Sequence, residues 1–128
     1  MADLGIRGNV MGPQPIAQRQ PLPPDMLEAA EHVMTMFQGG EVEALTAISV
    51  SATADEVRTI ASSLTPGRYT RHEIIATARV IHHYYLKVRM FGDRVEPFSL
   101  QFRLGHKDGQ WLIWEIINLT GRRAAWTR

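Results

Sequence analysis

The chain contains no cysteine. Disulfide bonds, thiolate metal sites and a cysteine nucleophile are therefore excluded. It also lacks an apolar run of the roughly 20 residues that a membrane-spanning helix needs. Residues 1–20 have no compact hydrophobic stretch of the kind that marks a signal peptide. These absences predict a protein of a reducing compartment, the cytoplasm, with no membrane partner.

The chain also lacks an excess of either charge, since the formal net charge is +1. The basic residues are mostly arginines, with Lys87 and Lys107 as the two lysines, and they are scattered along the chain. Proteins that bind nucleic acids usually carry a basic stripe, often with aromatic stacking partners. We therefore expect no nucleic-acid partner.

The content that is present is ordinary for a globular protein: 128 residues, 45% hydrophobic and 21% charged. This length predicts one domain with its own core. Residues 1–24 are rich in Gly, Pro and Gln without apolar periodicity, which predicts a flexible arm. We expect the domain itself over residues 25–121 and a basic tail over residues 122–128.

Helical periodicity occupies the first part of the domain. A helix is predicted from Asp25, which with Glu28 resembles a capping box, to the glycines that follow Phe37. A short second helix is predicted over residues 41–48. Thr53 and Glu56 form a capping box for a third helix, which ends before Pro66.

After Gly67 the apolar period changes from 3.6 to 2, which indicates strands. Turn residues at Gly92–Asp93 and at 107–109 favour antiparallel hairpins, while the break near residues 81–83 has no Gly or Pro. In the first strand, alternation assigns these residues to one face: Ile74, Ala76, Ala78 and Val80.

The last strand, residues 110–119, is apolar on both faces. Simple alternation assigns Trp111, Ile113 and Ile117 to one face. It assigns Leu112, Trp114 and Ile116 to the other. A strand that is apolar on both faces is covered on both. The helices cover one face, and a partner subunit, a ligand or the N-terminal arm covers the other.

Three helices followed by an antiparallel meander resemble the nuclear transport factor 2-like superfamily, a cystatin-like α+β roll. The resemblance covers about residues 25–119. It rests on the helix break at Gly39–Gly40–Glu41, the Asp108–Gly109 turn, and Trp111, Ile113 and Ile116 on the closing strand.

The resemblance implies an α+β fold in which three N-terminal helices pack on a curved antiparallel sheet of about four strands. The sheet would form a cone with an apolar cavity at its open end. One departure is that only residues 49–52 separate the second and third helices, which leaves no room for a hairpin that some members carry there. The superfamily includes isomerases, dehydratases, epoxide hydrolases, carriers and adaptors, so fold alone selects no activity.

Glu115 is the candidate catalytic residue, because it interrupts an apolar strand face and several enzymes of the superfamily place an acid on that strand. A carboxyl group in an apolar cavity can act as a general acid or base. The alternative is a cross-strand ion pair of Glu115 with Arg103 or Arg89.

A candidate ligand-binding set follows from large apolar residues on the first helix and the sheet. It comprises Met34, Phe37, Tyr84, Phe102, Trp111 and Trp114. No metal site or cofactor is expected, because His82 and His83 are adjacent and would point to opposite faces of a strand.

The sequence predicts a homodimer formed through the sheet that serves as a small-molecule-binding or interaction module with an apolar cavity, in which a small apolar ligand is allowed. The alternative is an enzyme, an isomerase, dehydratase or epoxide hydrolase, with Glu115 and either Tyr84 or His82 converging on a closed cavity. A third hypothesis assigns the basic tail, with Arg122, Arg123, Trp126 and Arg128, to an acidic partner.

Overall fold

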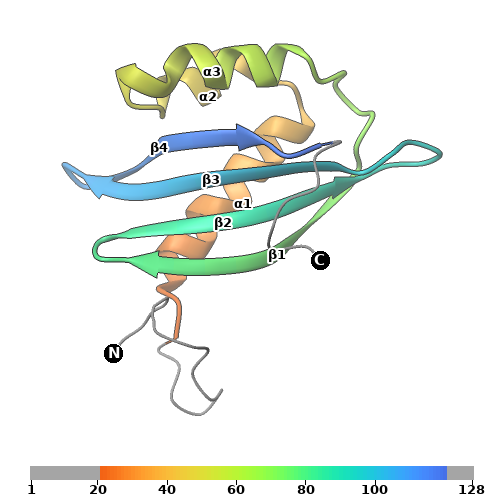
Figure 1. Ribbon diagram of the computed structural model, residues 1–128. Coiled ribbons are helices and arrows are strands. Elements are labelled where there is room, and N and C mark those ends of the chain that lie inside the picture. Colours follow the sequence, from red (N-terminus) through yellow and green to blue (C-terminus); the bar gives the residue numbers. More distant parts are fainter. Residues whose placement is uncertain (1–20, 121–128) are drawn as a thin grey trace.

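The computed structural model describes residues 21–120. Three helices precede four strands, and the strands form one antiparallel sheet in the order β1-β2-β3-β4. The helices lie together on one side of the sheet (Figure 1). This is the predicted α+β fold. The predicted tail and residues 1–20 of the predicted arm lie outside the described residues.

Helix α1 (Pro24–Gln38) begins with proline at its first position, where the missing N–H would have no helical partner. Its buried face repeats at helical spacing through Met26, Ala30 and Phe37. The predicted cap was wrong, because Pro23 is the N-cap residue and the helix has no side-chain cap. The Asp25 carboxylate instead accepts a hydrogen bond from the indole N–H of Trp111, at 3.0 Å.

Helices α2 (Val42–Ala47) and α3 (Ser51–Ser62) follow a break at Gly39 and Gly40. Gly40 has φ +63°, and a Cβ there would lie 2.8 Å from the Cγ of Pro66. The predicted capping box of α3 was wrong, since Val50 is its N-cap. The hydroxyl of Thr53 donates instead to the backbone carbonyl of Trp114, at 2.6 Å.

The sheet consists of β1 (Arg71–Val80), β2 (His83–Phe91), β3 (Phe98–Lys107) and β4 (Gln110–Asn118). The β3–β4 turn has positive φ at both Asp108 and Gly109, the backbone that favours a two-residue hairpin. The β1–β2 turn has Ile81 at φ 58° with its side chain 77% exposed. A β-branched residue in this conformation explains why the turn had no sequence signal.

Irregularities in two strands change the faces that simple alternation assigned. One lies in β1 between Ile74 and Ala76, and the other in β4 opposite Arg103 and Leu104, where Trp114 is the extra residue. The assignment of Ile117 to the Ile113 face was therefore wrong. Ile116 pairs with Phe102 and lies in the core, while Ile117 pairs with Gln101 on the other face.

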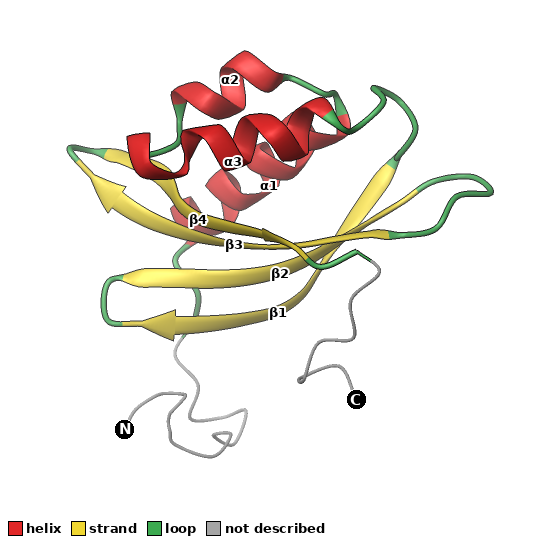
Figure 2. Ribbon diagram, turned by 45° about the horizontal axis from the view of Figure 1, so that its top comes forward, coloured by secondary structure: helices red, strands yellow, loops and turns green. Residues whose placement is uncertain are grey.

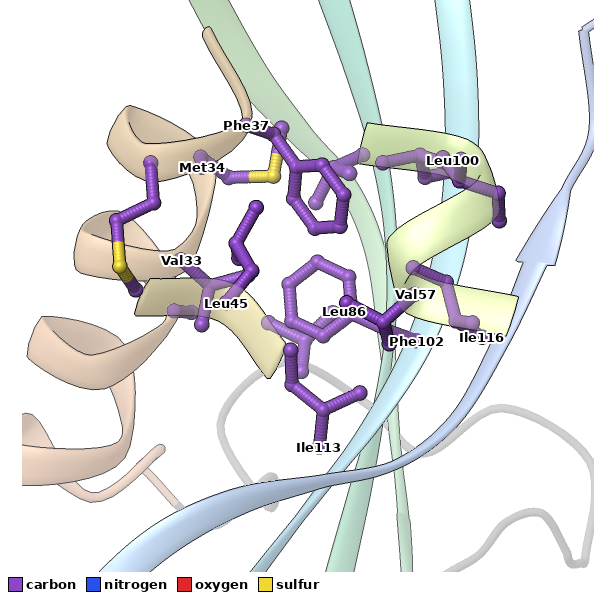
Figure 3. Close-up of a cluster of buried hydrophobic side chains, with 14 of the residues drawn as sticks. Val33, Met34, Phe37, Leu45, Val57, Leu86, Leu100, Phe102, Ile113 and Ile116 are labelled. Carbon is purple, nitrogen blue, oxygen red and sulfur yellow. The ribbon is translucent and has the colours of Figure 1, made fainter. Parts of the chain in front are cut away.

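The hydrophobic core fills the space between the helices and one face of the sheet (Figure 3). Phe37 from α1, Leu45 from α2 and Val57 from α3 are fully buried there. The sheet contributes core-facing residues from β2, β3 and β4, namely Leu86, Leu100, Phe102 and Ile113. Each of these side chains is at most 1% exposed, so this part of the core is packed.

The segment between α2 and α3 is tied to β4 by backbone hydrogen bonds. Val50 N–H donates to the carbonyl of Ile113, at 3.0 Å, and Ile113 N–H donates to that of Ile48, at 2.8 Å. These bonds form a parallel bridge between Ser49 and Ile113. Within residues 21–120, no helix is long and apolar enough to cross a membrane.

Candidate functional site

The second face of the sheet carries no helix from the described residues, and we call it the helix-free face. Figure 2 shows the helices stacked on the opposite side. Strand register arranges its side chains in rows that cross the four strands. The three complete rows, from β1 to β4, are Val80–His83–Gly105–Leu112, Ala78–Tyr85–Arg103–Glu115 and Ala76–Lys87–Gln101–Ile117.

In the row at the β1–β2 turn, two rings meet above Gly105. The His83 and Trp114 ring centroids are 5.0 Å apart, and the Trp114 indole N–H donates to the Gly105 carbonyl at 3.2 Å. A Cβ on Gly105 would lie 2.5 Å from a nitrogen of each ring. Glycine is therefore what lets the two rings approach the strand.

The pKa of His83 is lowered from its ordinary value. Desolvation by burial is the main cause, and the charges of Arg103 and His82 act in the same direction. Glu115 opposes them. Neutral imidazole is therefore the favoured form of His83 near neutral pH.

Glu115 lies in the middle row, paired with Arg103. The Arg103 guanidinium is 2.9 Å from one Glu115 carboxylate oxygen, and the Glu115 side chain is 48% exposed. The Tyr85 hydroxyl lies 3.4 Å from the other oxygen. This is the cross-strand ion pair that the sequence offered as the alternative to a cavity acid. Tyr84 points to the core face and His82 lies in the β1–β2 turn, so neither converges with Glu115.

A hollow of about 400 Å³ opens on the helix-free face, which we call the Lys87 hollow. Its lining comes from the first three strands: Ala76, Thr77, Ala78, Tyr85, Lys87 and Gln101. Lys87 is 4% exposed although no described helix covers it. Burial lowers its pKa, and the neighbouring charge of Arg89 lowers it further.

The predicted ligand-binding residues do not form one set. Four of them, Met34, Phe37, Tyr84 and Phe102, lie in the core with at most 6% exposure. Trp111 is packed against that core between the rings of Tyr84 and His106. Trp114 lies on the helix-free face with His83. Their contact with a ligand stays a prediction, and the hollow that the structure presents is lined by other residues.

Sequence reasoning missed Lys87, Gln101 and the two alanines of the hollow. A signal existed for Lys87, because it interrupts a strand whose other face is wholly apolar and it is one of two lysines in the chain. None existed for Ala76 and Ala78, which alternation placed with Ile74. The irregularity between Ile74 and Ala76 turns both alanines to the helix-free face.

Among the described side chains, no three His, Asp or Glu residues lie close enough together to hold a metal ion. No family model matches the chain, and no curated protein does. The fold is similar to that of a Campylobacter jejuni protein whose crystal structure is described as an NTF2-like transpeptidase. The two share 10% sequence identity at a TM-score of 0.57, over 70% of this chain and 97% of that one. The chain therefore has the NTF2-like fold.

Proposed function

We propose that this protein, which has an NTF2-like fold with no described helix on one face of its sheet, is an interaction module that self-associates through that helix-free face. The observation that carries the proposal is the set of apolar side chains on that face. Val80 and Ile117 are 45% and 38% exposed, at opposite ends of the three rows. Leu112 and Trp114 lie between them, half-buried, on β4. Burial of this surface against a second copy would remove it from water.

The polar residues of the face also suit an interface. Trp, Tyr and Arg are the residue types that contribute most to binding at protein interfaces. Trp114, Tyr85 and Arg103 form a contiguous group at the centre of this face. A two-fold dimer would bring the same group from both copies together.

The experiment is sedimentation of the purified full chain, as wild type and as Ile117→Lys. The wild type is expected at twice the 14.4 kDa chain mass. A lysine in place of this exposed apolar side chain would bury an unpaired charge in the interface and raise the dissociation constant by on the order of a hundredfold. Ala52→Lys is the control, because it adds the same charge to an exposed position on α3. A wild type that sediments as a monomer at all concentrations would refute the proposal, and so would equal effects of the two variants.

The structure does not have the geometry that the enzyme hypothesis based on Glu115 requires. That hypothesis required Glu115 to meet Tyr84 or His82 in a closed cavity, whereas Glu115 is half-exposed and ion-paired with Arg103. The transpeptidase description of the Campylobacter jejuni protein does not support the enzyme hypothesis. At 10% identity the similarity indicates a shared fold and identifies no catalytic residue in this chain. An interaction module therefore fits the geometry better than an enzyme built on Glu115.

A further inference from the structure

His83 lies among the apolar side chains that carry the proposed self-association. Register places it on the helix-free face between Val80 of β1 and Gly105 of β3, in the row that ends at Leu112. Its ring packs against that of Trp114, with 5.0 Å between the centroids. A second copy seated on this face would cover the imidazole. Self-association would therefore bury a group that ordinarily titrates close to neutral pH.

Among the five histidines of the chain, His83 is the one that belongs to the three complete rows of the helix-free face. The others lie outside those rows: His32 on α1, His82 in the β1–β2 turn, and His72 and His106 on the helix side of the sheet. A proton taken up near neutral pH at this face therefore goes to His83.

The groups that face His83 favour its neutral form. Burial is the main cause that lowers the pKa of His83, followed by the charges of Arg103 on β3 and His82 in the turn. From β4, Glu115 raises this pKa, but its carboxylate is already paired with Arg103 at 2.9 Å. From β1, the neighbour is the apolar side chain of Val80. The protomer thus holds a neutral ring at the position that a second copy would cover.

Positive charge also predominates over the whole helix-free face. Register assigns five cationic side chains and two carboxylates to it: Arg71, Lys87, Arg89, Arg103 and Lys107, against Glu73 and Glu115. Both carboxylates lie beside arginines of the same face. A two-fold dimer sets this face against itself, so each copy meets the same excess of positive charge on its partner. A protonated His83 in each copy would add two more charges of that sign.

The direction of the pH effect follows from proton linkage. A second copy would lower the pKa of His83 further, because it removes water from the ring and brings positive charge towards it. The dimer then binds fewer protons than two separate protomers, so a fall in pH favours the protomers. One histidine per protomer couples two protons to dissociation. The dissociation constant can therefore rise by up to about a hundredfold per pH unit.

We propose that His83 makes self-association through the helix-free face dependent on pH, with the dimer formed while the imidazole is neutral and released when it is protonated. This inference rests on the proposed self-association and names the group that regulates it. Release begins below about pH 6.5, the ordinary pKa of histidine, since the surroundings of His83 lower its pKa.

The test is sedimentation equilibrium of the full chain at a series of pH values from about 7.5 to 5.0. The wild-type dissociation constant should be constant near the upper end of the series. It should rise by about tenfold or more towards the lower end. Circular dichroism of the same samples distinguishes dissociation of folded protomers from unfolding.

Three variants identify the group responsible. His83→Phe keeps a ring against Trp114 and removes the titrating group, so its dimer should persist across the series. His83→Lys carries a positive charge throughout, and at the upper end it should dissociate about as readily as the wild type does at the lower end. His82→Gln is the matched control, because His82 is the exposed neighbour in the turn. This control should keep the wild-type rise.

The outcomes separate this inference from the proposed function. A wild-type dimer with the same dissociation constant at every pH overturns the role of His83 and leaves self-association standing. A rise that persists in His83→Phe, or that His82→Gln removes equally, also overturns that role. So does a rise that follows loss of the circular dichroism signal, because it reports unfolding. A wild type that is monomeric at every pH refutes self-association, and the regulation with it.

Discussion

Gly105 leaves room on the helix-free face for two aromatic rings. The rings of His83 and Trp114 approach its Cα so closely that a Cβ would lie 2.5 Å from a nitrogen of each. We expect Gly105→Ala to displace one or both rings and lower the free energy of unfolding by about 1–3 kcal/mol. Urea unfolding measures the change, and tryptophan fluorescence should report the displaced indole.

Gly39→Ala is the control for this substitution. A Cβ on Gly39 would meet the flexible carboxylate end of Glu41 at 3.1 Å, which can move aside. Its effect on stability should therefore be smaller. Equal losses in the two variants would show that the rings are not held by the strand as described.

His83 predicts a pH dependence of stability. Its pKa in the folded protein lies below its ordinary value, so the unfolded chain binds the proton first as the pH falls. The folded state should therefore lose stability as the pH falls through about 6.5, the pKa of an unperturbed histidine. At higher pH, where His83 is neutral in both the folded and the unfolded chain, its contribution to the free energy of unfolding is constant.

His83→Phe should remove this part of the dependence while keeping a ring against Trp114. Unfolding free energies measured between about pH 5.5 and 7.5 should change less steeply in the variant than in the wild type. His32→Gln, at an exposed position of α1, should keep the wild-type slope. The same slope in wild type and His83→Phe would contradict the prediction.

At the scale of elements, the irregularity in β4 is held in place by a side chain of α3. The hydroxyl of Thr53 donates to the Trp114 carbonyl at 2.6 Å, and Thr53 is 8% exposed. Thr53→Val keeps the shape of the side chain and removes the donor. It should cost about 1 kcal/mol of stability, because the carbonyl loses its partner.

Thermal or urea unfolding tests this against Thr59→Val, which changes an exposed threonine of the same helix. Thr59→Val should stay within about 0.5 kcal/mol of the wild type. If the two variants unfold at the same midpoint, the hydrogen bond does not hold the irregularity in place.

Much of the arrangement of helices and strands could be predicted from the sequence. The order of the elements, the buried side of α1 and the two-residue turn at Asp108–Gly109 follow from local periodicity and turn chemistry. The strand irregularities could not be predicted. One extra residue in a strand shifts every later side chain to the opposite face, and no residue type in β1 or β4 marks the position where this happens. This is why Glu115 was placed with Trp111 and Ile113, when the strand turns it toward Arg103.

The caps of α1 and α3 show a second limit. Asp25 and Thr53 are residue types that cap helices, and both were predicted to do so. In the structure each bonds to β4 instead, Asp25 to the Trp111 indole and Thr53 to the Trp114 carbonyl. Local sequence identifies a group that can form a hydrogen bond, while only the packing of distant elements selects its partner.

At the scale of the whole molecule, large side chains pack the space between the helices and one face of the sheet. Phe37, Leu45 and Phe102 occupy the space between helices and sheet with at most 1% exposure. The opposite face of the sheet, the helix-free face, carries the exposed apolar side chains of Val80 and Ile117. These exposed apolar groups are the observation behind the proposed self-association.

Self-association predicts a stability that depends on protein concentration. If dissociation accompanies unfolding, the thermal midpoint should rise over a hundredfold increase in concentration. The Ile117→Lys variant should show a smaller change of midpoint over the same concentration range, because its dimer is weaker. A wild-type thermal midpoint that does not change with protein concentration would contradict the proposed dimer.

The bridge between Ser49 and Ile113 has a further consequence for assembly. With the α2–α3 segment bonded to Ile113 and Thr53 bonded to Trp114, a foreign strand meets an occupied border at β4. Within the described chain, β1 and β4 are the two border strands, and the isolated Ser49 bridge lies on the outer border of β4. Strand addition is therefore expected to start at β1 rather than at β4. Two copies joined through β1 would occupy the β1 border of both, and growth into a fibre would then need the β4 border, which the Ser49 bridge and the Thr53 hydroxyl obstruct at Ile113 and Trp114.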